Sequence, residues 1–197
     1  MISAYKKILD GVVAKSDSRP VLKGVHYQNG NVVATDSHQL VLFKDVTDNK
    51  ELDVTIDLST YLPIDGNYPD TDRLIPTDNT TQLTFHNVDE LTGVVNYLKA
   101  AKKQLIDMDI KDNGLSMELH DAPGMSYNQE VEWNGDSLDI RFNASYLYNA
   151  LSYLDRLHKG EPGNYNGDIT IHFNGQLRPF TIEYGKMVYL VCPVRNF

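Results

Sequence analysis

The stretches QLTFHNVDELTGVVNYL (residues 82–98) and LDIRFNASYLYNALSYL (residues 138–154) align without a gap at a spacing of 56 residues. In both, a strand-like segment precedes an asparagine, and apolar residues at helical spacing follow it. The matched positions are Asn87 with Asn143, Leu91 with Leu147, Val95 with Leu151, Tyr97 with Tyr153, and Leu98 with Leu154. Because strand-like segments also follow each helix, the repeat predicts a βαβββ unit or one close to it.

Three segments have the i, i+3, i+4 spacing of an amphipathic helix: residues 2–16, 88–104 and 144–159. Asn87 and Asn143 are the expected N-caps of the second and third helices, and Gly160 is the expected stop of the third. The first helix is interpreted as a third copy of the unit that begins without its leading strand.

Alternating apolar residues predict strands through most of the remaining chain, for example at 41–43, 115–119 and 169–173. The turn sequences QNGN, DNG and FNGQ predict antiparallel hairpins. Many short strands with three helices indicate an α+β fold. The segment GNYPDTDRLIP (residues 66–76) has two prolines and no periodicity, so we interpret it as a connector and place a domain boundary near Pro76, between residues 1–76 and 77–197.

Composition excludes several classes of protein. The 197-residue chain has 41% hydrophobic residues, enough to bury a core, and its single cysteine, Cys192, allows no internal disulfide. One cysteine fits a reducing compartment, so we expect a cytoplasmic protein. No apolar run approaches the ~20 residues of a membrane span, and the first residues lack the apolar block of a signal peptide.

The charge is unevenly distributed. The net charge is −9, yet the three predicted helices carry eight basic and four acidic residues, or +4, which leaves −13 for the remainder. If the helices share a face, that face can meet phosphates while the other surface repels them. The alternative is that lysines gather at helix C-termini because the helix dipole favours cations there.

Familiar catalytic and metal patterns are missing. Thr35–His38 (TDSH) contains Asp, Ser and His, but neighbours in one turn cannot converge as a triad, so Asp36 and Ser37 are expected to cap a turn. The six histidines lack metal-ligand spacing, and the glycines form no phosphate-binding loop. Asp107, Asp109 and Asp112 alternate like calcium ligands without the following Glu, which favours a solvated strand edge and a hairpin turn. We expect neither an enzyme nor a cofactor.

Five blocks in order resemble the bacterial sliding clamp family, the β subunit of DNA polymerase III. They are RPVLKGV (19–25), VVATDSHQLVLF (32–43), NYPDTDRLIP (67–76), FNASYLYNAL (142–151) and YLVCPVRNF (189–197). The resemblance implies a DNA-clamp fold, in which repeated strand-helix-strand units form outer antiparallel sheets and an inner wall of helices. Residues 1 to about 60 resemble the first half of the family's middle domain, and residues 77–197 its complete last domain.

The resemblance also implies partners: double-stranded DNA bound without sequence preference, peptides of polymerases and clamp loaders, and further copies of the chain. The basic residues that would face DNA are Lys6, Lys7, Lys15, Lys99, Lys102, Lys103, Arg156 and Lys159. The family's peptide pocket carries over to Leu22, Thr35, His38, Leu40, Pro69, Arg73, Leu74, Leu190, Pro193, Val194 and Arg195. The alternative for these leucines is ordinary core packing.

The sequence also departs from the family. Gln39 stands where the family usually has Arg, Cys192 where Met is common, and Asn196 and Phe197 replace a terminal leucine. A shortened first portion would remove the surface that closes the family's ring. Two hypotheses follow: a compact clamp, of the kind a phage or mobile element would carry, and an adaptor or decoy that binds clamp-binding peptides without forming a ring.

Overall fold

The computed structural model describes residues 2–77 and 81–194. The α-helices are α1 (Ile2–Val12), α2 (Thr92–Ala100), α3 (Ala144–Ser152) and α4 (Leu154–Gly160), and the 3-10 turns are η1 (Pro20–Lys23), η2 (Asp72–Leu74) and η3 (Val88–Leu91). The strands are β1 (Val25–Gln28), β2 (Asn31–Thr35), β3 (Gln39–Phe43), β4 (Asp53–Ile56), β5 (Thr81–Phe85), β6 (Leu105–Lys111), β7 (Gly114–Leu119), β8 (Ser126–Glu130), β9 (Glu132–Asn134), β10 (Leu138–Asn143), β11 (Ile169–Phe173), β12 (Phe180–Tyr184) and β13 (Met187–Val191). Within these residues, no helix is both long and apolar enough to cross a membrane.

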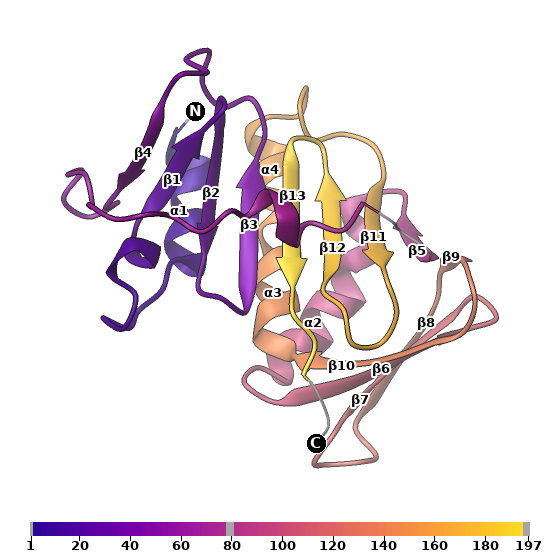
Figure 1. Ribbon diagram of the computed structural model, residues 1–197. Coiled ribbons are helices and arrows are strands. Elements are labelled where there is room, and N and C mark those ends of the chain that lie inside the picture. The colour runs from indigo at the N-terminus through magenta and orange to yellow at the C-terminus, as the bar shows by residue number, and fades with distance from the viewer. Residues whose placement is uncertain (1, 78–80, 195–197) are drawn as a thin grey trace.

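Two antiparallel sheets organise the described chain. The larger has the order β4-β1-β2-β3-β13-β12-β11-β5-β9, and the smaller has the order β10-β6-β7-β8. Figure 1 shows the four α-helices together on one side of the larger sheet, with the smaller sheet packed below them. This confirms the predicted α+β class.

The predicted repeat is confirmed. Each helix is followed by a three-stranded meander: α1 by β1-β2-β3, α2 by β6-β7-β8, and α3 with α4 by β11-β12-β13. In the two complete units the leading strands change places, because β5 pairs with β11 and β10 pairs with β6. This exchange, with α2 packed on α3, ties the two units into one body.

Local sequence sets the helix limits, which differ from prediction at three points. The first helix ends at Val12, not at residue 16, because the following KSDSRP segment competes for backbone hydrogen bonds and Pro20 disfavours helix before it. The second starts with the turn η3 and ends at Ala100, not at residue 104. The third is divided at Tyr153, whose hydroxyl lies against Gly11 of α1, where an added Cβ would be only 3.3 Å away.

The core contacts both sheets and all four helices. Phe180 joins the sheets, since its ring lies 5.5 Å from Phe142 and 5.2 Å from Phe173. A second cluster covers the opposite face of β3 and β13, where Tyr68 and Ile75 of the connector pack on Leu40, Leu190 and their neighbours. Alternating exposure is therefore the wrong prediction for β3 and β13, which are buried at every position because the connector crosses them.

The segment after β4 holds the beginning of a further unit. β4 pairs with β1 in the way that β10 pairs with β6, and Asp57 follows β4 as Asn143 follows β10. Asp57 Oδ1 accepts hydrogen bonds from the Ser59 and Thr60 amides, and the Tyr61 amide donates to the Asp57 carbonyl at 2.8 Å. One helical turn is thus formed, but Tyr61 adopts a φ of 59° and Pro63 follows, so the turn does not continue.

The predicted caps can be tested by mutation. Asn143 accepts a hydrogen bond from the Ser145 amide at 2.9 Å, and Asn87 accepts from the Asp89 and Glu90 amides. We expect Asn143→Ala to lower the free energy of unfolding by ~1 kcal/mol, because it leaves a helix N-terminal amide without its acceptor.

Urea denaturation gives this loss, and Asn96→Ala is the matched control. Asn96 is an exposed residue within α2 with no capping role, and alanine favours helix there. If Asn143→Ala and Asn96→Ala unfold at the same urea midpoint, the Asn143 cap does not stabilise α3.

Candidate functional site

The first and last parts of the described chain meet at the pairing of β3 with β13. Leu40 lies opposite Leu190 and Val41 opposite Tyr189 in an antiparallel register. The Cys192 amide extends the pairing by donating to the His38 carbonyl at 2.9 Å. Residues of the predicted peptide pocket that are distant in sequence are brought together at this junction.

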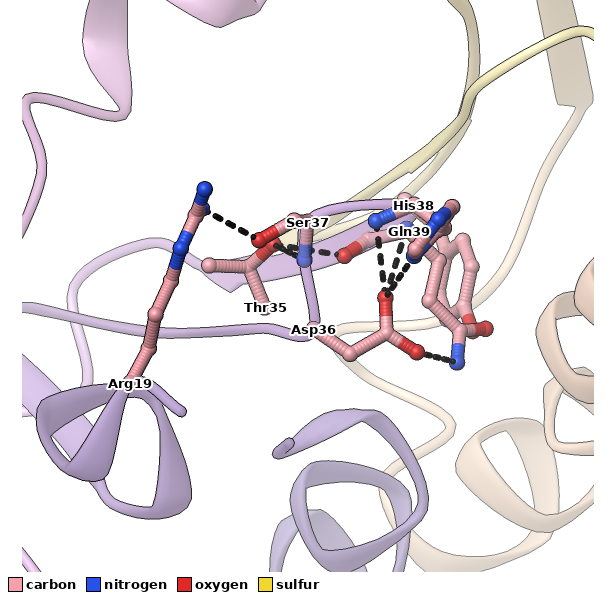
Figure 2. Close-up of polar contacts among 7 residues, drawn as sticks. Arg19, Thr35, Asp36, Ser37, His38 and Gln39 are labelled. Carbon is pink, nitrogen blue, oxygen red and sulfur yellow. Dashed lines mark hydrogen bonds and ion pairs between the residues drawn. The ribbon is translucent and has the colours of Figure 1, made fainter. Parts of the chain in front are cut away.

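The β2–β3 turn forms one rim of the junction and is fixed by its own side chains (Figure 2). Asp36 Oδ1 accepts from the amides of His38 and Gln39 at 2.8 and 3.0 Å, and its Oδ2 accepts from Gln39 Nε2. The Thr35 hydroxyl donates to the Gln39 carbonyl at 2.7 Å. The prediction that Asp36 caps a turn is confirmed, and its carboxylate is fully engaged in shaping that turn.

Gln39 has a structural role at this point. It is buried, and its Oε1 accepts a hydrogen bond of 2.6 Å from the Tyr189 hydroxyl. Burial raises the pKa of Tyr189 well above its ordinary value, so the phenol remains a donor. Gln39 therefore links the turn to β13 through a neutral hydrogen bond.

A groove of about 510 Å³ lies beside this turn. Its walls are the end of α1, the segment around η1 and the β2–β3 turn, with buried Leu22 at its base and exposed His38 at its rim. Arg19 reaches across and donates to the Ser37 hydroxyl at 2.9 Å (Figure 2). An apolar base with a cationic and an imidazole rim suits a short apolar peptide segment.

The connector carries the second group of predicted residues. Pro69, Arg73 and Leu74 are exposed, and Leu74 keeps 49% of its surface accessible. Arg73 Nε lies 2.7 Å from an Asp70 carboxylate oxygen. The predicted pocket residues therefore lie in two places, the groove and the connector, and Leu40 and Leu190 pack beneath the connector.

The remaining predicted residues have varied surroundings. Thr35 is buried within the turn, while Pro193 and Val194 are half-buried beyond β13. Arg195 lies outside the described residues. Leu40 and Leu190 belong to the small apolar cluster under the connector, so the core-packing alternative accounts for their burial.

Sequence reasoning missed Tyr146 and Arg19. The Tyr146 ring, on α3, stacks on His38 with ring centres 6.1 Å apart. Both residues lie inside blocks that carry the family resemblance, and that position was the available signal.

The predicted DNA-facing cations lie on or beside the helices. All are exposed except Lys6, which is half-buried. Lys6 pairs with Asp10 and Lys159 with Asp155 at 2.9 Å. In the described chain, the remaining predicted cations form no ion pair with a carboxylate: Lys7, Lys15, Lys99, Lys102, Lys103 and Arg156.

Three of these cations were predicted to lie within helices but lie beyond the helix ends. Lys15 lies beyond α1, and Lys102 and Lys103 lie beyond α2, because those helices end earlier than predicted. Lys102 is directed over the Tyr148 ring of α3 at 5.1 Å. These lysines therefore extend the basic surface past the helix ends.

The prediction that Asp107 and Asp109 lie on an edge strand is wrong, because β6 lies between β10 and β7 in the smaller sheet. Asp107 receives hydrogen bonds from Arg141 and His120, which hold its pKa below the ordinary value although partial burial alone would raise it. Asp112 occupies the predicted hairpin turn. Among residues 2–77 and 81–194, no three His, Cys, Asp or Glu side chains gather as a metal site.

Comparison with known proteins identifies the fold. No family model matches, but the chain is 28% identical to the beta sliding clamp of Streptococcus pneumoniae over 245 positions, covering 97% of this chain and 62% of the relative. The Bacillus subtilis beta sliding clamp is 26% identical, covering 94% and 60%. This chain is a shortened homologue of the bacterial beta sliding clamps.

Solved clamp structures have the same fold as this sliding-clamp homologue. The Streptococcus pneumoniae DNA polymerase III beta chain superposes with a TM-score of 0.75 at 28% identity, over 98% of this chain and 63% of that one. The Bacillus subtilis DNA polymerase sliding clamp gives 0.77 at 22% identity, over 98% and 62%. The homologue spans about 62% of the length of the curated relatives that it matches.

The difference in length lies partly inside the aligned span. Since 97% of 197 residues is about 191, about 54 of the 245 aligned positions have no residue in the homologue. A helix with its meander occupies a similar length here: residues 2–43 in one unit and residues 144–191 in another. The number of positions without a residue is therefore close to the length of one such unit.

The attachment of the connector predicts a pH dependence. The His26 ring stacks on Tyr68 with centres 4.6 Å apart, and burial lowers the pKa of His26 although Asp53 opposes the shift. The folded state therefore holds neutral His26. We expect stability to be lost as the pH falls from the ordinary histidine pKa near 6.5 through the lower folded-state value.

Urea unfolding at pH 7.5 and pH 5.5 measures this loss, and His26→Phe is the test variant because it keeps a ring on Tyr68 without a titrating group. Other groups titrate alike in both proteins, so the wild type should lose more stability on acidification than His26→Phe. Equal losses of stability in the two proteins would contradict the conclusion that His26 is neutral in the folded state.

Proposed function

We propose that this chain is a non-enzymatic, clamp-type processivity factor that binds double-stranded DNA without sequence preference and holds peptides of a polymerase or clamp loader. The observation that carries the proposal is the homologous fold, which joins a basic helical surface to a β3–β13 junction bearing a groove. Beta sliding clamps and DNA polymerase clamps are the proteins to which the chain is similar. We further propose that residues 1–76 correspond to the first half of the family's middle domain plus the connector, and residues 77–197 to its last domain.

DNA binding is supported by the arrangement of charge. The helices lie on one side of the larger sheet (Figure 1), and the exposed cations on and beside them contrast with a net charge of −9. Unpaired lysines can release phosphate counterions without first breaking an ion pair. The proposed DNA face comprises Lys6, Lys7, Lys15, Lys99, Lys102, Lys103, Arg156 and Lys159.

Peptide binding is supported by the two apolar features of the junction. Leu22 forms the base of the groove, and Leu74 extends from the connector into solvent. His38 and Arg73 provide polar groups that can orient a bound segment. The proposed peptide site retains all of the residues transferred from the family, Arg195 included.

An adaptor or decoy is the alternative function. The interrupted unit after β4 favours it, because a chain that lacks one unit keeps the peptide site while losing part of the ring wall. Retention on closed circular DNA, compared with the same DNA after linearisation, separates the two functions. A clamp remains on the circle and slides off the linear form, whereas an adaptor shows no such difference.

The peptide site predicts unequal effects for two exposed leucines. We expect Leu74→Ala to weaken a fluorescent clamp-binding peptide by ~10-fold, or ~1.4 kcal/mol, because binding buries this side chain. The measurement is fluorescence anisotropy.

Leu177→Ala is the matched control, since Leu177 is 59% exposed in the β11–β12 loop, far from the connector in sequence. It should bind the peptide like the wild type. Equal affinities for both variants would exclude Leu74 from the site.

The DNA face predicts a salt-dependent effect of charge reversal. We expect Lys102→Glu with Lys103→Glu to weaken binding to duplex DNA and to reduce the slope of log K against log salt by up to about 2, since each lost phosphate contact contributes ~0.9.

Lys44→Glu with Lys186→Glu has the same net charge and is the control. Both residues lie outside the helices: Lys44 is exposed beyond β3, and Lys186 is half-buried in the β12–β13 turn. If the control lowers the slope equally, net charge rather than the helical surface governs binding.

A further inference from the structure

The turn that ends α2 carries two adjacent lysines of the proposed DNA face, Lys102 and Lys103, and both are exposed. The Gln104 amide donates to the Ala101 carbonyl at 3.0 Å, which closes a β-turn with Lys103 as its third residue. Lys103 has a φ of 72° and is the only lysine or arginine with positive φ among the residues that the structure describes. This position of a turn ordinarily favours glycine, because a Cβ is unfavourable at positive φ.

The helix α3 holds this turn in place through hydrogen bonds to its backbone. The Lys103 amide donates to the Ser145 hydroxyl at 3.0 Å, and the Ala144 amide donates to the Gln104 carbonyl at 3.0 Å. These contacts engage the amide of the residue with positive φ and the carbonyl of the residue after it. The first two residues of α3 therefore maintain an unfavourable backbone conformation.

The same helix holds the side chain of the first lysine. Lys102 Nζ lies over the Tyr148 ring, 5.1 Å from its centre, which is within the range of a cation–π contact. Tyr148 follows Ser145 by three residues, so the two side chains are neighbours on one face of α3. That face thus fixes the backbone of Lys103 and the ammonium group of Lys102.

Contact with an aromatic ring leaves the Lys102 ammonium group able to bind an anion. By contrast, Lys6 is held by the Asp10 carboxylate at 2.9 Å, so a phosphate must compete with that carboxylate for the ammonium group. The Tyr148 ring attracts a cation but carries no negative charge, and the N–H donors of Lys102 can still reach a phosphate. A lysine that is already ordered also loses less side-chain entropy when it binds.

We propose that Ser145 and Tyr148 of α3 are positioning residues for the DNA face, which hold Lys102 and Lys103 in the conformation that contacts DNA phosphates. The inference rests on the proposed binding of duplex DNA, and it adds that two uncharged side chains control the strength of that binding. A lysine at a turn position that favours glycine lowers the stability of the fold. Its contact with phosphate is the gain that offsets this loss.

Titrations of duplex DNA, followed by fluorescence anisotropy, test Tyr148 without changing the net charge. We expect Tyr148→Leu to weaken binding by ~3-fold and to lower the slope of log K against log salt, because Lys102 is no longer held for contact with a phosphate. Tyr148→Phe keeps the ring and should bind DNA like the wild type. In a Lys102→Met background, Tyr148→Leu should have no further effect, which distinguishes positioning of Lys102 from a general loss of structure.

Lys103→Gly tests the turn, and Lys99→Gly is the matched control because Lys99 lies within α2. Both variants remove one positive charge and should weaken DNA binding. We expect Lys103→Gly to raise the midpoint of urea unfolding, since glycine tolerates positive φ, and Lys99→Gly to lower it, since glycine disfavours helix.

Three results would each overturn the proposal: equal losses of affinity in Tyr148→Leu and Tyr148→Phe, an undiminished effect of Tyr148→Leu in the Lys102→Met background, or a lowered urea midpoint for Lys103→Gly. Failure of the proposed function gives a different result. Lys102→Glu with Lys103→Glu would then leave DNA binding unchanged, and the inference would fail with it. If this charge reversal weakens binding while Tyr148→Leu does not, only the positioning role is wrong.

Discussion

The antiparallel pairing of β3 with β13 is the contact on which the remainder of the structure depends. It joins residues 39–43 to residues 187–191 and makes one nine-stranded sheet of the two segments. Both strands are buried on both faces, by the helices on one side and by the connector on the other. The connector depends on this pairing, because it packs across both strands, and the groove and the β2–β3 turn lie beside it.

The polar groups at this junction are satisfied locally. Asp36 holds the amides of its own turn, and Gln39 accepts from Tyr189 across the sheet. A second polar set lies beneath α1, where the Tyr5 hydroxyl donates to Glu161 at 2.8 Å and accepts from Tyr165. Buried polar groups with defined partners fix a single arrangement of the two segments, because any other leaves donors or acceptors unpaired.

Much of the fold could be predicted from local sequence, because short sequence patterns determine the repeat, the caps at Asn87 and Asn143 and the hairpin turns. The helix ends at Val12 and Ala100 were predicted less well, since periodicity continues beyond the point where turn-forming residues interrupt the backbone. Burial of both faces of β3 and β13 could not be predicted, because it depends on a connector that packs from a distance in sequence. Tyr146 was missed for the same reason, as its contact with His38 exists only once the two segments meet.

The interrupted unit after β4 gives the described chain an odd number of helix-and-meander units. Two of these units exchange leading strands with each other, whereas the unit of α1 and β1–β3 pairs with β4 of the interrupted unit. The two ends of the described body are therefore unlike each other. Assemblies that join like ends then need two different contacts to close, while head-to-tail assemblies need one contact between unlike surfaces.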